Sequence, residues 1–228
     1  MHTEVDVALA DPDARTGELR VMGEAVRDTV DSCERLIESL LVLARSEAAA
    51  GREEPVDVAA LVGDCITDLR ARAQDARIEV STALDPAWTC GEPGLLERMT
   101  ANLVDNGLRH NQRGGYLKVS THVVDRQVRL GVRNGGAVID PAQAQTLTEP
   151  FRRLDRARDG FGLGLSIVRS VARAHGGTIE VLAPENGGLE VTVALPAFSS
   201  TAAAILPTVA PTKANVVVAR TPDALTKS

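Results

Sequence analysis

Two hydrophobic periods alternate along residues 56–195, and their order restricts the fold more than any other feature of this sequence. Helical spacing marks three segments, residues 56–74, 93–109 and 164–174. Strand-like spacing marks six further segments, residues 78–81, 87–90, 116–124, 127–133, 178–182 and 189–195. Helices that alternate with short strands and hairpins predict an α+β fold, here a two-layer α/β sandwich.

A different pattern precedes this region, between residues 16 and 48. Apolar or small side chains recur at alternating spacings of three and four residues, at Leu19, Met22, Val26, Thr29, Cys33, Leu36, Leu40 and Leu43. This heptad stripe predicts a helix that packs against another helix in a bundle. Residues 46–55 are polar and end in proline, so we expect a linker there.

These patterns divide the chain into three regions. We expect a helical hairpin in residues 1–50, the sandwich in residues 51–197 and a tail in residues 198–228. The tail is rich in alanine, threonine, valine and proline and has no convincing hydrophobic period. Such a segment buries too little apolar surface to fold, so we expect it to be disordered.

The composition argues against several classes of function. A net charge of −6 and an isoelectric point near 5.3 give no electrostatic support for nucleic-acid binding. The three cysteines form no CxxC pair, which favours buried reduced thiols over a zinc site or a disulfide framework. The N-terminus lacks the features of a signal peptide, and no apolar run approaches the ~18 residues of a membrane span. We therefore expect a cytoplasmic protein without membrane insertion.

The helix predicted at residues 93–109 carries polar residues at the edge of its apolar stripe. Asn102, Asn106 and Arg109 lie about a quarter turn from the side chains that should face the sheet. A carboxamide oxygen is a suitable magnesium ligand, and an arginine beside it could hold phosphate oxygens. A solvated helix edge is the alternative, and this segment alone does not separate the two.

Two glycine-rich segments follow. Residues 160–166 open directly into a helix, where backbone amides and the helix dipole favour an anion. This is not a P-loop, because no Gly-Lys-Ser/Thr follows, and no strand leads into it as in a dinucleotide-binding fingerprint. Asn134-Gly135-Gly136 ends a predicted strand and would let the chain turn tightly under a flat ligand. Each segment alone fits an ordinary turn equally well.

Taken in order, these segments resemble the boxes of histidine kinase catalytic domains. The N box is resembled by NLVDNGLRH, the G1 box by VRNGG, the F box by EPFRRL and the G2 box by GFGLGLSIV. Further along, the segments AHGGTIEV and GGLEVTVALP resemble the terminal hairpin of that domain. Before it, the segment RLIESLLVLARSE resembles the second helix of the dimerisation and phosphotransfer domain. The resemblance covers roughly residues 4–196 and implies a Bergerat-type ATP-binding fold, with three helices on a mixed sheet.

The resemblance also implies roles for single residues. Asn106 would be the magnesium ligand, and Asn102 and Arg109 would lie at the phosphates of ATP; these three would be the catalytic residues. The other residues implied at the nucleotide are His110, Asn134, Gly136, Phe151, Gly160, Gly162, Leu163, Gly164 and Leu165. The three glycines from 160 to 164 would let the G2 loop close over the phosphates, and Phe151 with residues 152–159 would form a short ATP lid.

Two features depart from the family pattern. Asn134 stands where the family has an aspartate that accepts a hydrogen bond from the adenine amino group, and a neutral acceptor should weaken ATP binding by about 1 kcal/mol. None of the four histidines has the His-Glu/Asp-Leu-Arg-x-Pro neighbours of the phosphorylated H box. We therefore expect the chain to begin midway along the first hairpin helix, as half of a split kinase or through a misplaced start or truncated gene. His175 is expected to end a helix and interact with its dipole.

These observations predict a component of a two-component histidine kinase. We expect it to bind Mg-ATP and to transfer the γ-phosphoryl group to a histidine of an H-box partner chain, with a response regulator as the next acceptor. The heptad stripe predicts a homo- or hetero-oligomer. The alternative is a degenerate module that binds a kinase or its regulator without turnover. An anti-sigma-factor serine kinase is disfavoured, because such kinases begin close to the sandwich.

Overall fold

The computed structural model describes residues 53–154, 161–199 and 216–217 of the 228-residue chain. The chain divides into two compact units, Met1–Leu41 and Val42–Ser228, and every described residue belongs to the second. The expected helical hairpin with its heptad stripe lies outside the described residues, as do Gly160 and most of the expected tail. Within the described ranges, no helix is long and apolar enough to cross a membrane.

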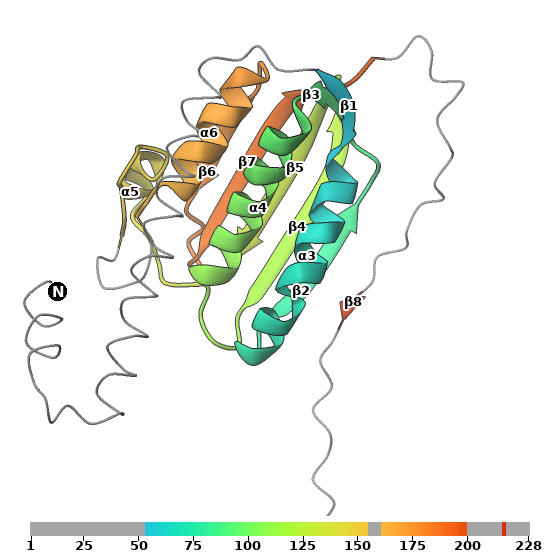
Figure 1. Ribbon diagram of the computed structural model, residues 1–228. Helices are drawn as coiled ribbons and strands as arrows, with labels where there is room; N and C mark the ends of the chain where they lie inside the picture. Colours follow the sequence, from blue (N-terminus) through green and yellow to red (C-terminus); the bar gives the residue numbers. More distant parts are fainter. Residues whose placement is uncertain (1–52, 155–160, 200–215, 218–228) are drawn as a thin grey trace, which may run out of the picture. The chain divides into compact units, whose positions relative to one another are not determined.

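One mixed sheet forms a layer of this unit, with its strands in the order β6-β7-β5-β4-β2-β8 (Figure 1). The strand bounds are Glu79–Leu84 (β2), Tyr116–Val124 (β4), Gln127–Asn134 (β5), Thr178–Leu182 (β6), Leu189–Pro196 (β7) and Val216–Val217 (β8). The strands β2 and β4 are parallel, whereas the other neighbouring pairs are antiparallel. The predicted hairpins β4–β5 and β6–β7 are therefore confirmed.

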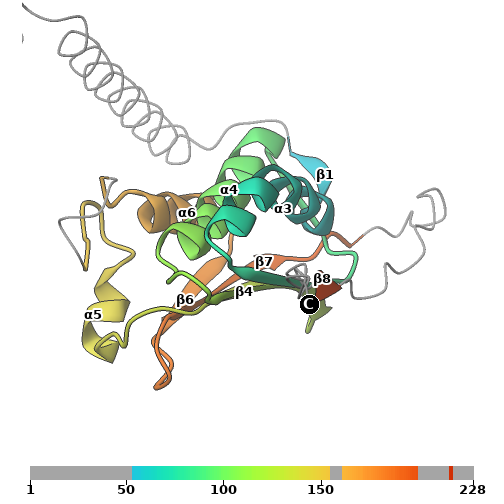
Figure 2. The same ribbon diagram turned by 90° about the horizontal axis from the view of Figure 1, so that it is seen from below.

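Three helices cover one face of the sheet, as Figures 1 and 2 show: α3 (Val58–Asp75), α4 (Pro93–Arg109) and α6 (Gly164–Ala174). Alternate strand residues are apolar and buried, among them Leu117, Val119, Val128, Leu130, Val132, Val191 and Val193. The residues between them are exposed or half-buried, such as Lys118 and Arg129. One dry and one wetter sheet face confirm the two-layer α/β sandwich of the α+β class.

Local sequence explains both ends of α4, the helix at the centre of the candidate site. Glu92 caps its start by accepting hydrogen bonds from the backbone nitrogens of Gly94 and Leu95, at 3.2 and 2.7 Å. Pro93 occupies the first helical position, where its missing N–H is no loss. The helix ends at Arg109, so both predicted bounds are confirmed.

The start of the sandwich differs from the prediction. The last two residues of the expected linker and the first two of the expected helix form strand β1 (Glu54–Asp57), which pairs antiparallel with β3 (Trp88–Gly91). The side chain of Asp57 accepts hydrogen bonds from the backbone nitrogens of Ala59 and Ala87, at 3.0 and 3.2 Å. Asp57 therefore caps α3 and fixes the first helical residue at Val58, two residues later than predicted.

Two further elements differ from the prediction. Strand β2 extends to Leu84 rather than residue 81, because its parallel partner β4 continues the ladder as far as Thr121. A short helix, α5 (Pro141–Thr146), was not predicted, although its start has a local signal. The Asp140 carboxylate accepts a 2.7 Å hydrogen bond from the nitrogen of Ala142, and Pro141 follows at the first helical position.

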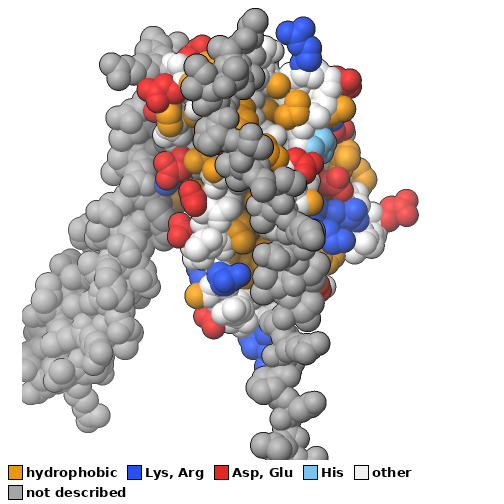
Figure 3. Space-filling model, turned by 90° about the vertical axis from the view of Figure 1, so that its right-hand side faces the viewer, with side chains coloured by type: hydrophobic (Ala, Val, Ile, Leu, Met, Phe, Trp, Pro, Cys, Tyr) orange, Lys and Arg blue, Asp and Glu red, His pale blue; other side chains and the backbone are white. Residues whose placement is uncertain are grey.

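The surface and the thiols bear on the excluded functions. Figure 3 shows the described acidic, basic and apolar side chains intermixed over one face of the molecule.

Cys65 and Cys90 are free thiols, but they are half-buried rather than buried as expected, and Cys33 lies outside the described residues. Burial raises the pKa of the Cys65 thiol from 9.0 to about 11, with further contributions from the nearby acids Asp68, Glu97 and Asp64.

Candidate functional site

The second half of α4 faces the start of α6 through Asn102. The side-chain nitrogen of Asn102 donates a 2.8 Å hydrogen bond to the carbonyl oxygen of Arg98, one turn earlier on the same helix. Its Oδ1 atom lies 3.9 Å from the place that a Cβ on Gly164 would occupy. Two segments that lie 62 positions apart, from residue 102 to residue 164, thus meet at this point.

The start of α6, next to Asn102, has no side-chain cap. Leu163 precedes the helix and caps it without a side-chain hydrogen bond. Helix N-termini carry partial positive charge, and uncapped amides there bind anions. The side chains of Leu163 and Leu165 are only 4% and 6% exposed, so they anchor the segment in the core while its backbone faces Asn102.

Arg109 is tied to its own helix and to α3. Its Nη2 atom lies 3.4 Å from Asp105 Oδ2, and Arg72 Nη1 lies 2.8 Å from Asp105 Oδ1. One carboxylate therefore holds two guanidinium groups, although all three side chains keep partial contact with solvent. Pairs of this kind are weak in water, so they do not prevent Arg109 from moving to another anion.

The end of α4 packs closely on the sheet at Gly107. A Cβ on this residue would lie 2.7 Å from Leu117 Cδ1 and 3.0 Å from Val132 Cγ1. It would also lie 3.9 Å from the Cβ of Asn134. Because Gly107 has no side chain, the helix that carries Asn106 can lie directly above the end of β5, where Asn134 is found.

Asn134 is a buried polar residue with a fixed orientation. Its side chain is 3% exposed, and its Nδ2 atom donates a 2.8 Å hydrogen bond to the carbonyl oxygen of Gly135. A carbonyl only accepts, so the amide nitrogen must be the atom on that side and Oδ1 the atom on the other. The carboxamide thus retains Oδ1 as an acceptor.

Two other predicted residues lie beside Asn134. A Cβ on Gly136 would lie 3.7 Å from Asn134 Nδ2 and 3.2 Å from the carbonyl oxygen of His110. The structure therefore brings His110, Asn134 and Gly136 together, although they come from the end of α4, the last position of β5 and the loop that follows. A Cβ on Gly188 would overlap the carbonyl oxygen of Asn134, so the β6–β7 turn also borders this region.

Sequence reasoning missed Asn111, which joins the end of α4 to β4. Its Nδ2 atom donates to the carbonyl oxygens of Tyr116 and Gly107, at 2.8 and 3.3 Å, and its Oδ1 atom accepts from Gln112 N at 3.0 Å. Tyr116 O also accepts a 2.9 Å hydrogen bond from Gly135 N, next to Asn134. An asparagine directly after a helix and before Gly114 is the only local signal for this role.

The base of the predicted lid is held by backbone contacts. Phe151 donates its N–H to the carbonyl oxygen of Gly162 at 3.0 Å and adopts a φ of 64°, which is uncommon for a bulky residue. Gly162 has a φ of 70°, and a Cβ there would lie 2.7 Å from Arg152 O. The Phe151 side chain is 63% exposed. Residues 155–160 of the lid lie outside the described residues.

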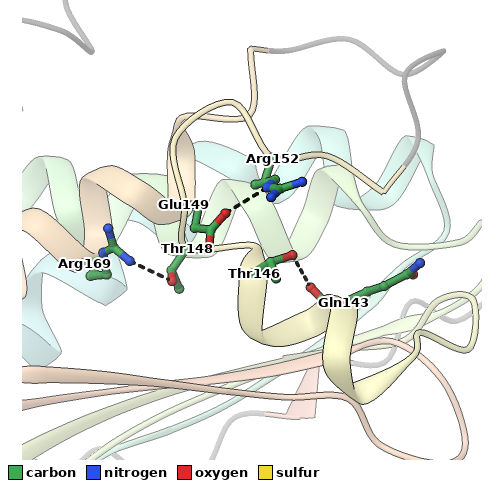
Figure 4. A network of polar contacts seen from close by, with 6 residues as sticks. All are labelled: Gln143, Thr146, Thr148, Glu149, Arg152 and Arg169. Carbon is green, nitrogen blue, oxygen red and sulfur yellow. Dashed lines mark hydrogen bonds and ion pairs between the residues drawn. The ribbon is translucent and has the colours of Figure 1, made fainter.

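A polar network connects the lid base to α6 (Figure 4). Arg169 of α6 donates a 3.4 Å hydrogen bond to Thr148 Oγ1, and Arg152 pairs with Glu149 at 2.8 Å. Thr148 is 8% exposed, so its hydroxyl is a buried partner for Arg169. The segment before Phe151 is thereby attached to the helix that begins at Gly164.

The side chains at the candidate site can be compared with the ligands that magnesium prefers. Within the described residues, no group of three or more His, Cys, Asp or Glu side chains could hold a metal ion. Magnesium instead takes few protein ligands when a nucleotide supplies phosphate oxygens and water completes the shell. The carboxamide oxygens of Asn102 and Asn106 on one helix edge suit that mode, so the residues fit the ion.

Comparison with known sequences places this site in a family. Residues 91–199 match the histidine kinase-, DNA gyrase B- and HSP90-like ATPases. The sensor protein CutS of Streptomyces coelicolor is 42% identical over 199 residues, 85% of this chain and 48% of CutS. The sensor protein kinase PmrB of Pseudomonas aeruginosa is 32% identical over 200 residues, 86% of this chain and 41% of PmrB. The chain thus spans about half of these relatives or less.

Solved structures agree with these matches. The mycobacterial sensor histidine kinase MprB superposes with a TM-score of 0.57 at 28% identity, over 64% of this chain and 97% of MprB. Full-length ShkA in complex with AMPPNP superposes with a TM-score of 0.68 at 26% identity, over 79% of this chain and 39% of ShkA. The common fold and the sequence matches lead to one conclusion: the chain carries a catalytic domain of the histidine kinase-type ATPase family and is a relative of sensor histidine kinases.

Proposed function

We propose that this chain binds Mg-ATP and transfers its γ-phosphoryl group to a histidine, as the catalytic component of a two-component histidine kinase. The observation that carries the proposal is the approach of Asn102 to the uncapped start of α6. The phosphates would lie between them, held by the amides of residues 162–165 and, after release from Asp105, by Arg109. Support also comes from ShkA, whose structure contains AMPPNP.

In this proposal Asn106 would hold magnesium through its carboxamide oxygen. The ion would supply charge neutralisation at the phosphates, which is the main requirement of phosphoryl transfer. The adenine base would lie against Asn134, whose Oδ1 atom is the acceptor left by the bond to Gly135. His110 and Gly136 would lie beside the adenine base. The lid, which includes Gly160, would cover the phosphates together with Phe151.

The acceptor histidine, the partners and the location complete the proposal. No histidine of this sequence has H-box neighbours, so we propose that an H-box protein accepts the phosphoryl group in trans and passes it to a response regulator. The heptad stripe in residues 1–50 would bind that protein or a second copy of the chain. We propose that residues 51–197 form the cytoplasmic catalytic domain. The tail in residues 198–228 would take no part in nucleotide binding, although it was expected to be disordered and its residues Val216 and Val217 instead pair with β2 as strand β8.

The first experiment measures nucleotide binding by calorimetry with and without magnesium. The wild-type protein should bind Mg-ATP and Mg-ADP, and Asn106→Ala should remove the magnesium-dependent part of the affinity. Gln127→Ala is the matched control, because Gln127 is an exposed carboxamide at the opposite end of β5 from Asn134. Absence of any heat at millimolar nucleotide would refute the proposal.

The second experiment follows phosphoryl transfer from labelled ATP. The protein alone should acquire no acid-labile phosphate, whereas an added H-box protein should become labelled. Leu36→Asp with Leu40→Asp should abolish labelling of that protein but leave nucleotide binding intact, because the charges interrupt the heptad stripe. Labelling of His2 or His175 in the protein alone would contradict the proposal.

The second candidate function is a degenerate module that binds a kinase or its regulator without turnover. Asn134 favours it, because a neutral amide forms a weaker hydrogen bond to adenine than a carboxylate. Nucleotide binding without labelling of any H-box protein would support this alternative.

A further inference from the structure

The side chain of His175 joins the two helices that carry the candidate phosphate site. Its Nε2 atom lies 3.1 Å from the backbone nitrogen of Glu92, and its Nδ1 atom lies 2.8 Å from the carbonyl oxygen of Val171. A backbone N–H only donates and a carbonyl only accepts, so Nε2 must be the acceptor and Nδ1 must carry the proton. Both ring nitrogens are therefore committed to backbone partners, one on each side.

Glycine at position 91 makes this contact possible. A Cβ on Gly91 would overlap the Cδ2 and Nε2 atoms of the His175 ring, so a larger residue would displace the ring. The next residue, Glu92, caps α4 with its carboxylate. The cap residue before α4 is thus bound, through its backbone, to His175, the cap residue after α6.

At the candidate phosphate site, the start of α6 lies beside the second half of α4. There Asn102 of α4 lies beside Gly164, the first residue of α6. From Pro93 to Asn102 and from Gly164 to His175 the helices rise about 14 and 17 Å, at 1.5 Å per residue. The helices are therefore antiparallel, with the His175 contact at one end and the phosphate gap at the other.

Between these points α4 and α6 contact each other, and both helices carry fully buried apolar side chains, such as Met99 of α4 and Val168 of α6. Apolar contact is non-directional, so it tolerates small shifts of one helix along the other. Hydrogen bonds weaken steeply when they are misaligned, so the bond from Glu92 N to His175 Nε2 resists such shifts, while the bond to Val171 O within α6 holds the ring in place. We propose that His175 is a positioning residue, which fixes α6 along α4 and thereby sets the gap between Asn102 and the amides at the start of α6.

This inference rests on the proposed nucleotide site, and its test separates the phosphate end from the base end. His175→Phe retains a ring but loses both hydrogen bonds, and Gly91→Ala retains the histidine but displaces its ring. Both variants should bind Mg-ATP roughly five- to tenfold more weakly, the effect of one or two neutral hydrogen bonds. Their affinity for adenosine, which lacks phosphates, should stay within twofold of the wild type.

Two further measurements complete the test. His175→Gln, whose amide can accept from Glu92 and donate to Val171, should recover part of the Mg-ATP affinity. His122→Phe, on an exposed position of β4, is the matched control and should change neither affinity. Nitrogen-15 spectra of the ring should show a protonated Nδ1 and an unprotonated Nε2 in the full-length protein.

The outcomes are distinct. Equal losses for Mg-ATP and adenosine in both variants, or no loss in either, would overturn the positioning role while leaving the proposed function in place. A wild-type protein that binds neither ligand would remove the proposed function, and with it the positioning role. A ring with the proton on Nε2 would also overturn the inference, because Nε2 could not then accept from Glu92.

Discussion

Replacing Asn111 with alanine should destabilise the domain, because this buried side chain holds three backbone groups together. The change removes hydrogen bonds to Tyr116 O, Gly107 O and Gln112 N, at 2.8, 3.3 and 3.0 Å. At ~1 kcal/mol each, the bonds contribute about 3 kcal/mol to the free energy of unfolding. Tyr116 O retains its bond from Gly135 N, which lowers the expected loss to about 2 kcal/mol.

The isosteric change Asn111→Asp should be worse and should depend on pH. A carboxylate would place a second oxygen against the carbonyls of Tyr116 and Gly107, in a site where the side chain is largely buried. Burial and repulsion raise the pKa of such a carboxyl group, so the charged form destabilises the fold. The stability lost near neutral pH should therefore return as the pH falls and the carboxyl group is protonated.

Thermal and urea unfolding of the full-length protein, followed by circular dichroism, measure both effects. Asn111→Ala should lower the midpoint of thermal unfolding by roughly 6 °C, at about 3 °C per kcal/mol for a domain of this size. Its loss should not vary with pH between 4 and 8, in contrast to that of Asn111→Asp. A loss below about 0.5 kcal/mol for alanine, or identical pH profiles for the two variants, would refute the assigned hydrogen bonds.

Three other predictions concern the fold around the site. Gly188→Ala should cost more than about 2 kcal/mol in urea unfolding, since φ is 82° and the new Cβ would overlap Asn134 O. The control Gly63→Ala, in a helix position with nothing within 4 Å, should instead stabilise by up to ~1 kcal/mol. Leu96→Ala, at a fully buried position of α4, should cost about 2–5 kcal/mol in the same assay. Alkylation of Cys65 at pH 8, read by mass spectrometry, should be up to about 100-fold slower in the folded than in the unfolded chain, because the folded pKa is about 11 rather than 9.0. The stability gained from this protonated thiol is present below pH 9.0 and is lost as the pH rises through about 11. Equal alkylation rates would contradict the raised pKa.

The sequence by itself determined the kinds and the order of most elements, though not of β1, α5 and β8. The bounds of α4, α6, β4 and β6 agree with the hydrophobic periods, because a helix or strand is selected by side chains that lie within one or two turns of each other. The order of the glycine and asparagine segments also indicated the family, which the comparisons confirm. These features depend on local spacing and on short motifs, and both can be read along the chain.

Tertiary structure alone decided which distant groups meet. The strand β1 exists because it pairs with β3, some thirty residues later, and no local period marks it. Arg109 was predicted at the phosphates, but its partner in this structure is Asp105, which also binds Arg72 from another helix. His175 was expected to interact with the end of its own helix, and it does so through Val171 O, while its second bond reaches Glu92, 83 positions away. Hydrogen bonds have short range and strict geometry, so such partners are fixed only once packing has placed the helices on the sheet.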